Sequence, residues 1–255
     1  MNVIVFDIET VPDVVLGRKL LNLCEISDPE VGEAMFAKAR ADTGNGFLRH
    51  HMHQIVAISL VLRVKDSFKV WSLGDEKSNE AELVTRFFSG IDKYIPVIVS
   101  WNGSGFDLPV LHYRALVHGI SAPTYWDAGE HNQQFRYNNY LNRFHARHLD
   151  LMDVLSGYQM RSVASLDDIA LLLGFPGKLG MEGSQVFKTY QQGNIQKIRH
   201  YCEQDVLNTY LIYLRFELIR GNLTHNQYEN ECILVRETLE SMSQPHLQEF
   251  LEAWK

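Results

Sequence analysis

The chain has 255 residues, 45% of them hydrophobic and 22% charged, which is an ordinary composition for one large globular domain or two small ones. Its three cysteines are widely spaced and odd in number, which argues against a disulfide framework, and neither a signal sequence nor a membrane-spanning run is expected. These features together lead us to expect a soluble, cytoplasmic protein without a membrane partner. The formal charge of −7 neither indicates nucleic-acid binding nor excludes it.

The first apolar run predicts a buried strand over residues 2–8, and a polar, irregular stretch follows it. We call this stretch, residues 10–53, the excursion, because it is predicted to interrupt a domain rather than to form one. A strand hairpin comes next, and strands then alternate with helices, which is typical of an α/β domain with a mixed sheet. The predicted strands are 2–8, 54–64, 67–73, 97–101 and 148–151, and the predicted helices are 29–40, 79–94, 107–118, 165–173 and 194–220, with one or two more before the C-terminus.

Asp7 and Glu9 stand at the end of the first strand, directly after the apolar run Val3–Phe6. Residues two apart in a strand point to the same face, so the two carboxylates lie side by side. Burying two like charges is costly unless a cation lies between them, and hard oxygen ligands favour a divalent ion such as Mg²⁺ or Mn²⁺. The plainer interpretation is a strand end in water, and only further carboxylates can decide between the two.

Two later segments supply such carboxylates. Asp107 follows the turn-rich run Asn102–Gly105 and begins a predicted helix, where an acid ordinarily complements the helix dipole. The glycines on either side of Ser104 suggest close approach by another group, of which a ligand backbone is one candidate. On the long helix, Tyr201 precedes Asp205 by four residues, so the phenol and the carboxylate share one face.

Taken in order, these segments read FDIET, NGSGFDLP and YCEQDVLNTY. This order resembles the three motifs of the DEDD superfamily of 3′–5′ exonucleases, in its tyrosine-containing branch. It is most similar to the stand-alone bacterial exonucleases related to the proofreading domain of family B DNA polymerases. The resemblance covers roughly residues 2–214 and includes the pieces HLDLMD, GFPGK and GSQV. It implies a ribonuclease H-like fold, with an exonuclease domain over residues 1–220 that carries the excursion, and residues 221–255 as a helical extension of the same domain.

The resemblance also implies hydrolysis of the phosphodiester bond at the 3′ end of single-stranded DNA, in repair or proofreading, with two Mg²⁺ or Mn²⁺ ions as cofactors. By analogy, Asp7 would bridge both ions. Glu9 and Asp205 would complete the binding site of the ion that activates the attacking water, and Asp107 would hold the second ion. Tyr201 would orient that water. Two other functions stay open: an exoribonuclease with the same site, and an inactive nucleic-acid-binding module, whose sign would be a lost carboxylate, although none is lost.

The helix motif allows a second interpretation, because the sister branch of the superfamily uses a histidine five residues before the last aspartate, and His200 stands at that position. Helix periodicity rotates a residue five back by roughly 140° away from Asp205, and a residue four back by only about 40°. The periodicity therefore favours Tyr201 over His200 as the residue that faces the carboxylate.

Several further residues are candidates for contact with a single-stranded substrate. Arg143 and Arg147 lie in a loop, residues 135–148, where aromatic and cationic side chains alternate, a composition that suits single strands. The alternative is that these rings cover the edge of the sheet. Lys178, in the glycine-rich loop over residues 174–183, is a candidate phosphate contact. The remaining candidates for substrate contact lie next to Asp107: Asn102, Gly103 and Phe106.

Other polar residues are interpreted as structural. Asp150 and Asp153 are three apart, so a strand would point them to opposite faces, and they are expected to cap a helix or to hydrogen-bond. The histidines within residues 50–53 are too close in sequence to converge on one zinc ion, and no cysteines follow at zinc-finger spacing. Cys202 has no evident base partner and is expected to pack in the core.

Overall fold

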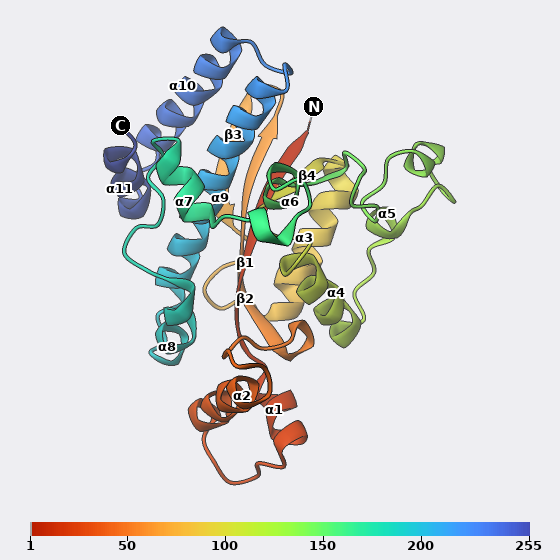
Figure 1. Cartoon of the computed structure of the whole chain (residues 1–255), viewed down its shortest axis with the longest axis vertical. Helices are drawn as coiled ribbons and strands as arrows, with labels where there is room; N and C mark the ends of the chain where they lie inside the picture. The colour runs from red at the N-terminus through yellow and green to blue at the C-terminus, as the bar shows by residue number, and fades with distance from the viewer. Residues whose placement is uncertain (1) are drawn as a thin grey trace.

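Five strands form one mixed sheet in the computed structural model, which describes residues 2–255 (Figure 1). The strands are β1 (Val3–Pro12), β2 (His53–Val64), β3 (Ser67–Ser72), β4 (Val97–Ser100) and β5 (His148–Asp150). Their spatial order is β3-β2-β1-β4-β5. The first three strands are antiparallel to one another, whereas β4 runs parallel to β1 and β5 parallel to β4. The predicted fold, a ribonuclease H-like mixed sheet flanked by helices, is confirmed.

Helices cover both faces of this sheet (Figure 1). One face is covered by α7 (Leu166–Leu172), α9 (Ile195–Ile219), α10 (His225–Ser241) and α11 (Pro245–Ala253). The other face is covered by α3 (Glu80–Tyr94), α4 (Asp107–His118) and α5 (Pro123–Trp126). Two short helices connect these elements, α6 (Leu151–Leu155) and α8 (Val186–Gln191). Among residues 2–255, no helix combines the length and the apolar character that crossing a membrane requires.

The residues of β1 alternate between the two helical layers. Val3 and Val5 pack in the hydrophobic cluster that contains α9, whereas Ile4 and Phe6 pack in the cluster that contains α3 and α4. This period of two is expected for a strand that is covered on both faces. The same period turns Asp7 toward α9.

Two further helices form most of the excursion, α1 (Val14–Leu21) and α2 (Asp28–Thr43), and they lie at the end of the molecule away from the N-terminus (Figure 1). The excursion leaves β1 and returns to β2 at neighbouring points, since Pro12 pairs with His53. Its small hydrophobic core contains Val31, Met35 and Leu48. It is therefore a folded insertion between two paired strands.

The first strand is longer than predicted. It continues past Ile8 to Pro12, and it stays paired with β2 through a bulge between Glu9 and Thr10. The bulge lies next to the paired acids, as bulges often do beside functional sites. The structure also contains α1, α5, α6 and α8, which the sequence did not predict as helices.

Candidate metal centre

The candidate centre lies where β1 extends beyond the end of its neighbour β4. β1 pairs with β4 only over Val3–Val5, so the following residues of β1 face an open sheet edge on that side. There the backbone N–H of Ile8 donates to Oδ1 of Asp107, 3.1 Å away, instead of to a strand. Asp107 is the first residue of α4, so the start of that helix brings its carboxylate against the end of β1, beside Asp7 and Glu9.

The long helix α9 packs across β1 and β2 and contributes further side chains from the opposite direction. Asp205 is buried there, and within residues 2–255 its Oδ1 has no hydrogen-bond partner. Cys202 is buried on the same face of the helix, and its Sγ donates to Oδ2 of Asp7 at 3.4 Å. The ligand atoms of Asp7, Glu9 and Cys202 all lie within 4.8 Å of one another. The four predicted carboxylates thus come from β1, α4 and α9 to one place.

Burial makes these carboxyl groups hard to ionise. Burial, followed by the charges of Asp107 and Glu9, raises the pKa of Asp7 well above its usual range. Burial and then the charge of Asp205 raise the pKa of Glu9 in the same way. Burial also raises the pKa of Asp107 to about 7 and the pKa of Asp205 to about 7. Only a nearby positive charge would restore the ionised form of all four acids, and Lys178 acts in that direction on Glu9 and Asp205.

The residues present fit divalent metal ions. The acids offer hard oxygen atoms, which Mg²⁺ and Mn²⁺ prefer, and the orphaned Oδ1 of Asp205 is a buried acceptor that lacks a partner. Cys202 is buried, as predicted, but its contact with Asp7 was not predicted. Its position three residues before Asp205 on one helix face is the signal that would have revealed it. Burial raises the pKa of the Cys202 thiol, which therefore stays protonated and donates.

Tyr201 lies on the face of α9 that carries Asp205, as helix periodicity predicts. Burial and then the charges of Asp205 and Glu9 raise the pKa of Tyr201 above its usual range, so its hydroxyl keeps its proton. His200 is turned elsewhere, because its ring stacks on the ring of His246 in α11 with centroids 3.7 Å apart. His200 therefore belongs to the contact between α9 and α11.

A buried aspartate shapes the loop that leads to Asp107. Oδ1 of Asp150 accepts the backbone N–H of Asn102 at 2.9 Å, and Oδ2 accepts that of Ser104 at 2.8 Å. The same side chain caps α6 by accepting the N–H of Asp153. The predicted structural role of Asp150 is confirmed. Its carboxylate also holds the loop that leads to Asp107, a candidate metal ligand.

The glycines of this loop serve its own packing. A Cβ at Gly103 would lie 2.3 Å from Oγ of Ser100, and a Cβ at Gly105 would lie 2.3 Å from Oδ1 of Asn102. The predicted close approach is observed, and its partners are side chains of the protein itself: the glycines let the loop fold tightly against the end of β4. Substrate contact by Asn102 and Gly103 stays a prediction.

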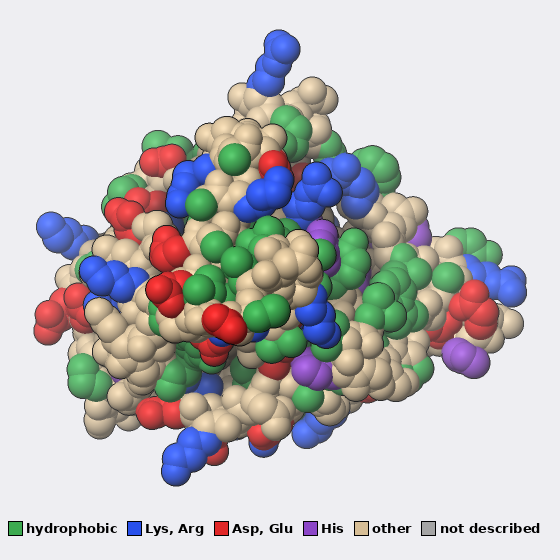
Figure 2. Space-filling model, turned by 90° about the horizontal axis from the view of Figure 1, so that it is seen from below, with side chains coloured by type: hydrophobic (Ala, Val, Ile, Leu, Met, Phe, Trp, Pro, Cys, Tyr) green, Lys and Arg blue, Asp and Glu red, His purple; other side chains and the backbone are tan. Residues whose placement is uncertain are grey.

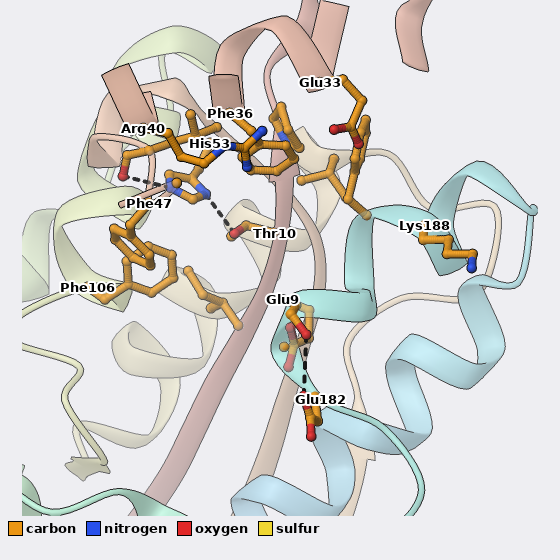
Figure 3. Close-up of a pocket in the computed structure, with 18 of the residues that line it drawn as sticks. Glu9, Thr10, Glu33, Phe36, Arg40, Phe47, His53, Phe106, Glu182 and Lys188 are labelled. Carbon is orange, nitrogen blue, oxygen red and sulfur yellow. Dashed lines mark hydrogen bonds between the residues drawn. The ribbon is translucent and has the colours of Figure 1, made fainter. Parts of the chain in front are cut away.

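A pocket of about 890 Å³ opens beside Glu9 (Figure 3). Residues 8–12 of β1 line it, together with parts of the excursion, the residue before α4, the start of α7 and the segment around α8. Phe106 and Lys178, which were both predicted to contact substrate, line this pocket. The excursion residues in its lining were not predicted, and they include Glu33, Phe36, Arg40, Phe47 and Leu48.

Arg143 and Arg147, in contrast, do not line this pocket. Arg143 forms an ion pair with Asp153 at 2.7 Å, and Arg147 donates to two backbone carbonyl groups. Phe135 and Tyr140 of the same loop are buried in the core. Tyr137 and Phe144, in contrast, are exposed. Two rings of residues 135–148 thus pack in the core and two do not, and substrate contact by Arg143 and Arg147 stays a prediction.

The sheet order and the cluster of carboxylates define the class of this protein: a ribonuclease H-like α/β domain with a candidate metal centre. Residues 45–254 match the family described as "Predicted 3'-5' exonuclease related to the exonuclease domain of PolB", and the chain belongs to this family. The match begins after Asp7 and Glu9, so of the four carboxylates it includes Asp107 and Asp205.

Two DNA polymerases are similar to parts of the chain. The DNA polymerase of Archaeoglobus fulgidus is 26% identical over 161 residues, which are 62% of this chain and 19% of the polymerase. The solved structure of the family B DNA polymerase from Pyrobaculum calidifontis has a TM-score of 0.50 and 16% identity, and the match covers 98% of this chain and 27% of that one. The chain thus spans well under half of either relative, and the structural likeness shows the fold alone.

Proposed function

We propose that the chain is a metal-dependent 3′–5′ exonuclease of the tyrosine-containing DEDD branch, which removes nucleotides from the 3′ end of single-stranded DNA. The observation that carries this proposal is the meeting of four desolvated carboxylates at the open edge of β1, contributed by Asp7, Glu9, Asp107 and Asp205. Carboxylates repel phosphate groups, so such a cluster suits a phosphodiester substrate only when cations are held between the two.

The four acids would hold two Mg²⁺ or Mn²⁺ ions, with Asp7 shared between them, and these ions would activate water and stabilise the departing 3′ oxygen. Tyr201 keeps its proton and can donate a hydrogen bond that orients the attacking water. Nζ of Lys178 lies 5.9 Å from the centre of the Tyr201 ring, where it can contact a phosphate group of the strand.

DNA is favoured as the substrate because both similar proteins are DNA polymerases. A role in DNA repair or proofreading, in the cytoplasm, belongs to the same proposal. An exoribonuclease would use the same carboxylates and would differ in its contacts to the 2′-hydroxyl group. An inactive binding module is disfavoured because no carboxylate of the cluster is missing.

We place this activity in one domain, residues 1–220 with the excursion inserted, to which residues 221–255 add a helical extension. The packing of the last two helices supports their assignment to the same domain. α10 and α11 bury Val235, Leu239 and Phe250 in the same hydrophobic cluster as Val3 of β1.

The test uses matched single strands of DNA and RNA, labelled at the 5′ end, with Mg²⁺ or Mn²⁺ and with EDTA. We expect stepwise shortening of the DNA from its 3′ end, which EDTA abolishes. Asp7→Ala should remove the activity, whereas Asp66→Ala, a control acid in the exposed turn between β2 and β3, should keep it. Activity in Asp7→Ala would contradict the proposed site, faster cleavage of RNA would change the substrate, and no cleavage by the unaltered chain would contradict the function.

A further inference from the structure

A row of buried polar side chains begins at the candidate centre and crosses the sheet. Asp7 of β1 pairs with Ser59 of β2, and Ser59 pairs with Ser72 of β3. Residues directly opposite each other on neighbouring strands point to the same face, so all three side chains lie on the face that α9 covers. Elsewhere on this face the strands carry buried apolar residues such as Val5 and Val61, so the two serines depart from the apolar pattern at the level of Asp7.

The hydroxyl groups of this row are oriented by an acid on α9. Oγ of Ser59 lies 2.9 Å from Oγ of Ser72, which donates to Oε1 of Glu203 at 2.6 Å; the carbonyl oxygen of Arg199 is farther away, at 3.5 Å. A carboxylate only accepts, so Ser72 uses its single hydrogen on Glu203 and accepts the hydrogen of Ser59. The other carboxylate oxygen of Glu203 accepts from Nε2 of His246 on α11, 2.7 Å away. The row therefore has a fixed direction, and it extends from β2 to α11.

Cys202 connects this row to Asp7. Its Sγ lies 3.4 Å from Oδ2 of Asp7 and also 3.4 Å from the backbone carbonyl oxygen of the same residue. The side chain of Ser59 interacts with the same thiol from the neighbouring strand. Because Cys202 is fully buried, water does not compete for these contacts. One thiol thus holds the side chain of Asp7 against its own backbone, and Ser59 holds the thiol.

The orientation of Asp7 matters because the surface offers little help in binding cations. Basic and acidic side chains are interspersed over the end of the molecule that carries the excursion (Figure 2), so this face presents no uniform negative charge. The affinity for metal ions then depends on the buried ligands, and Asp7 is the ligand that both proposed ions share. A carboxylate that is already oriented loses less freedom when an ion binds.

We infer that Cys202 and Ser59 are positioning residues for the metal ions: the thiol fixes the orientation of the Asp7 carboxylate, and the hydroxyl fixes the thiol. The inference rests on the proposed function and adds to it two residues that act through Asp7. The thiol serves as a donor to a ligand and not as a ligand, because hard ions such as Mg²⁺ and Mn²⁺ prefer oxygen.

The test measures the binding of Mn²⁺ to the full chain without nucleic acid, from the electron paramagnetic resonance signal of the free ion. Cys202→Ala removes the donor and should raise the Kd for Mn²⁺ about tenfold, at the low end of the range for residues that orient metal ligands, because a thiol is a weak donor. Cys202→Ser keeps a donor, so it should bind Mn²⁺ more tightly than Cys202→Ala and nearly as tightly as the unaltered chain.

Ser59→Ala tests whether the hydroxyl acts through the thiol. It should raise the Kd about threefold in the otherwise unaltered chain, the effect of one neutral hydrogen bond, and should have no further effect when it is combined with Cys202→Ala. The same increase in both backgrounds would show that Ser59 acts independently of Cys202, and it would overturn the row.

Cys232→Ala is the matched control, because it removes a thiol from α10, a helix that contributes none of the four carboxylates, and it should bind Mn²⁺ normally. An unchanged Kd in Cys202→Ala, or an equal loss in Cys202→Ser, would overturn the inference. Circular dichroism shows whether each variant is folded. If Cys202→Ala does not fold, Ser59→Ala decides alone, and an unchanged Kd in that variant would overturn the inference.

Failure of the proposed function gives a different result. Normal binding of Mn²⁺ without release of nucleotides would contradict the function and leave the positioning residues in place. Absence of Mn²⁺ binding by the unaltered chain would overturn the metal centre and the inference together.

Discussion

Asp205 is the residue in which burial and charge conflict most directly. The residue is 7% exposed, and its Oδ1 has no hydrogen-bond partner among residues 2–255. Burying an unpaired acceptor costs about 1–3 kcal/mol, and more when the group is charged. Unpaired buried acceptors of this kind are concentrated at functional sites, and a bound cation would remove the conflict.

The same conflict predicts a pH-dependent stability for the protein without metal ions. Burial raises the pKa of Asp205 from 3.8 to about 7, so the folded form holds this proton more tightly than the unfolded form, and the free energy of unfolding falls as the pH rises from about 4 to about 7. Asp205→Asn removes this loss. We expect the variant to be more stable than the unaltered chain in EDTA, by a margin that grows to roughly 1–4 kcal/mol at about pH 8.

Urea unfolding of both proteins across this pH range measures the margin. The buried histidines with lowered pKa, His53, His112 and His148, titrate in both proteins and cancel in the difference. Added Mg²⁺ or Mn²⁺ should stabilise the unaltered chain more than the variant. A margin that does not change with pH would show that Asp205 is not protonated on folding.

The neighbouring residues Tyr201 and His200 give a second prediction at this scale. Tyr201→Phe removes only the hydroxyl and keeps the ring in its cluster with Val11 and Ile198. We expect kcat for nucleotide release to fall about 100-fold, a usual size for loss of a group that orients or protonates a reactant. His200→Ala should leave kcat nearly unchanged, and the reverse result would assign the chain to the histidine branch.

At the scale of the elements, the loop before α4 is held by hydrogen bonds to Asp150, a residue far from it in the sequence. Asp150→Ala leaves the N–H groups of Asn102 and Ser104 without their partner and uncaps α6. We expect a loss of about 1–3 kcal/mol in the free energy of unfolding and a lower kcat, because the loop positions Asp107.

Asp153→Ala is the matched control for that variant. It breaks an ion pair with the half-exposed Arg143, so its cost should be under about 1 kcal/mol, and kcat should not change. Equal effects of the two variants on kcat would show that Asp150 does not position the loop. Denaturant unfolding and nucleotide-release kinetics on the same preparations give both values.

The regular elements of the sheet could be predicted because each carries a long periodic pattern. The helix over residues 107–118 was predicted with its observed bounds, and the helix predicted over residues 79–94 is observed as α3 with Asn79 as its N-cap. The helices α1, α6 and α8 have 5 to 8 residues, too few turns to show a hydrophobic period. The predicted first strand ended at Ile8 because polar residues follow it. In the structure, pairing with β2 keeps these residues extended.

The candidate site could be predicted only in part, for a related reason. Motif order predicted which acids meet, because their types and spacing are local properties of the sequence. The contact between Asp107 and Ile8 depends on β4 ending early, and the position of the excursion beside the pocket depends on tertiary contacts such as Phe36 with Phe187. The composition of residues 135–148 could not show that Phe135 and Tyr140 are buried whereas Tyr137 and Phe144 are exposed, because burial depends on packing and not on residue type.

At the scale of the whole molecule, the last two helices are part of the core. Val235, Leu239 and Phe250 are fully buried. A chain that ends at residue 220 would expose the α9 surface that they cover, so we expect it to be insoluble or to unfold without a cooperative transition, whereas the full chain should unfold in one step. Soluble expression and calorimetry test this, and a stable, cooperative 1–220 fragment would contradict the proposed single domain.

The pairing of Pro12 with His53 has a consequence for how this molecule can change. The backbone leaves the sheet and rejoins it at adjacent rungs of one ladder, and the N–H of Asp13 still bonds to the carbonyl oxygen of Met52, 2.8 Å away. Segments of other lengths can be grafted between these points without shifting the register that places Asp7 and Glu9. The excursion can therefore change in length or sequence while the paired strands that carry the two acids stay the same.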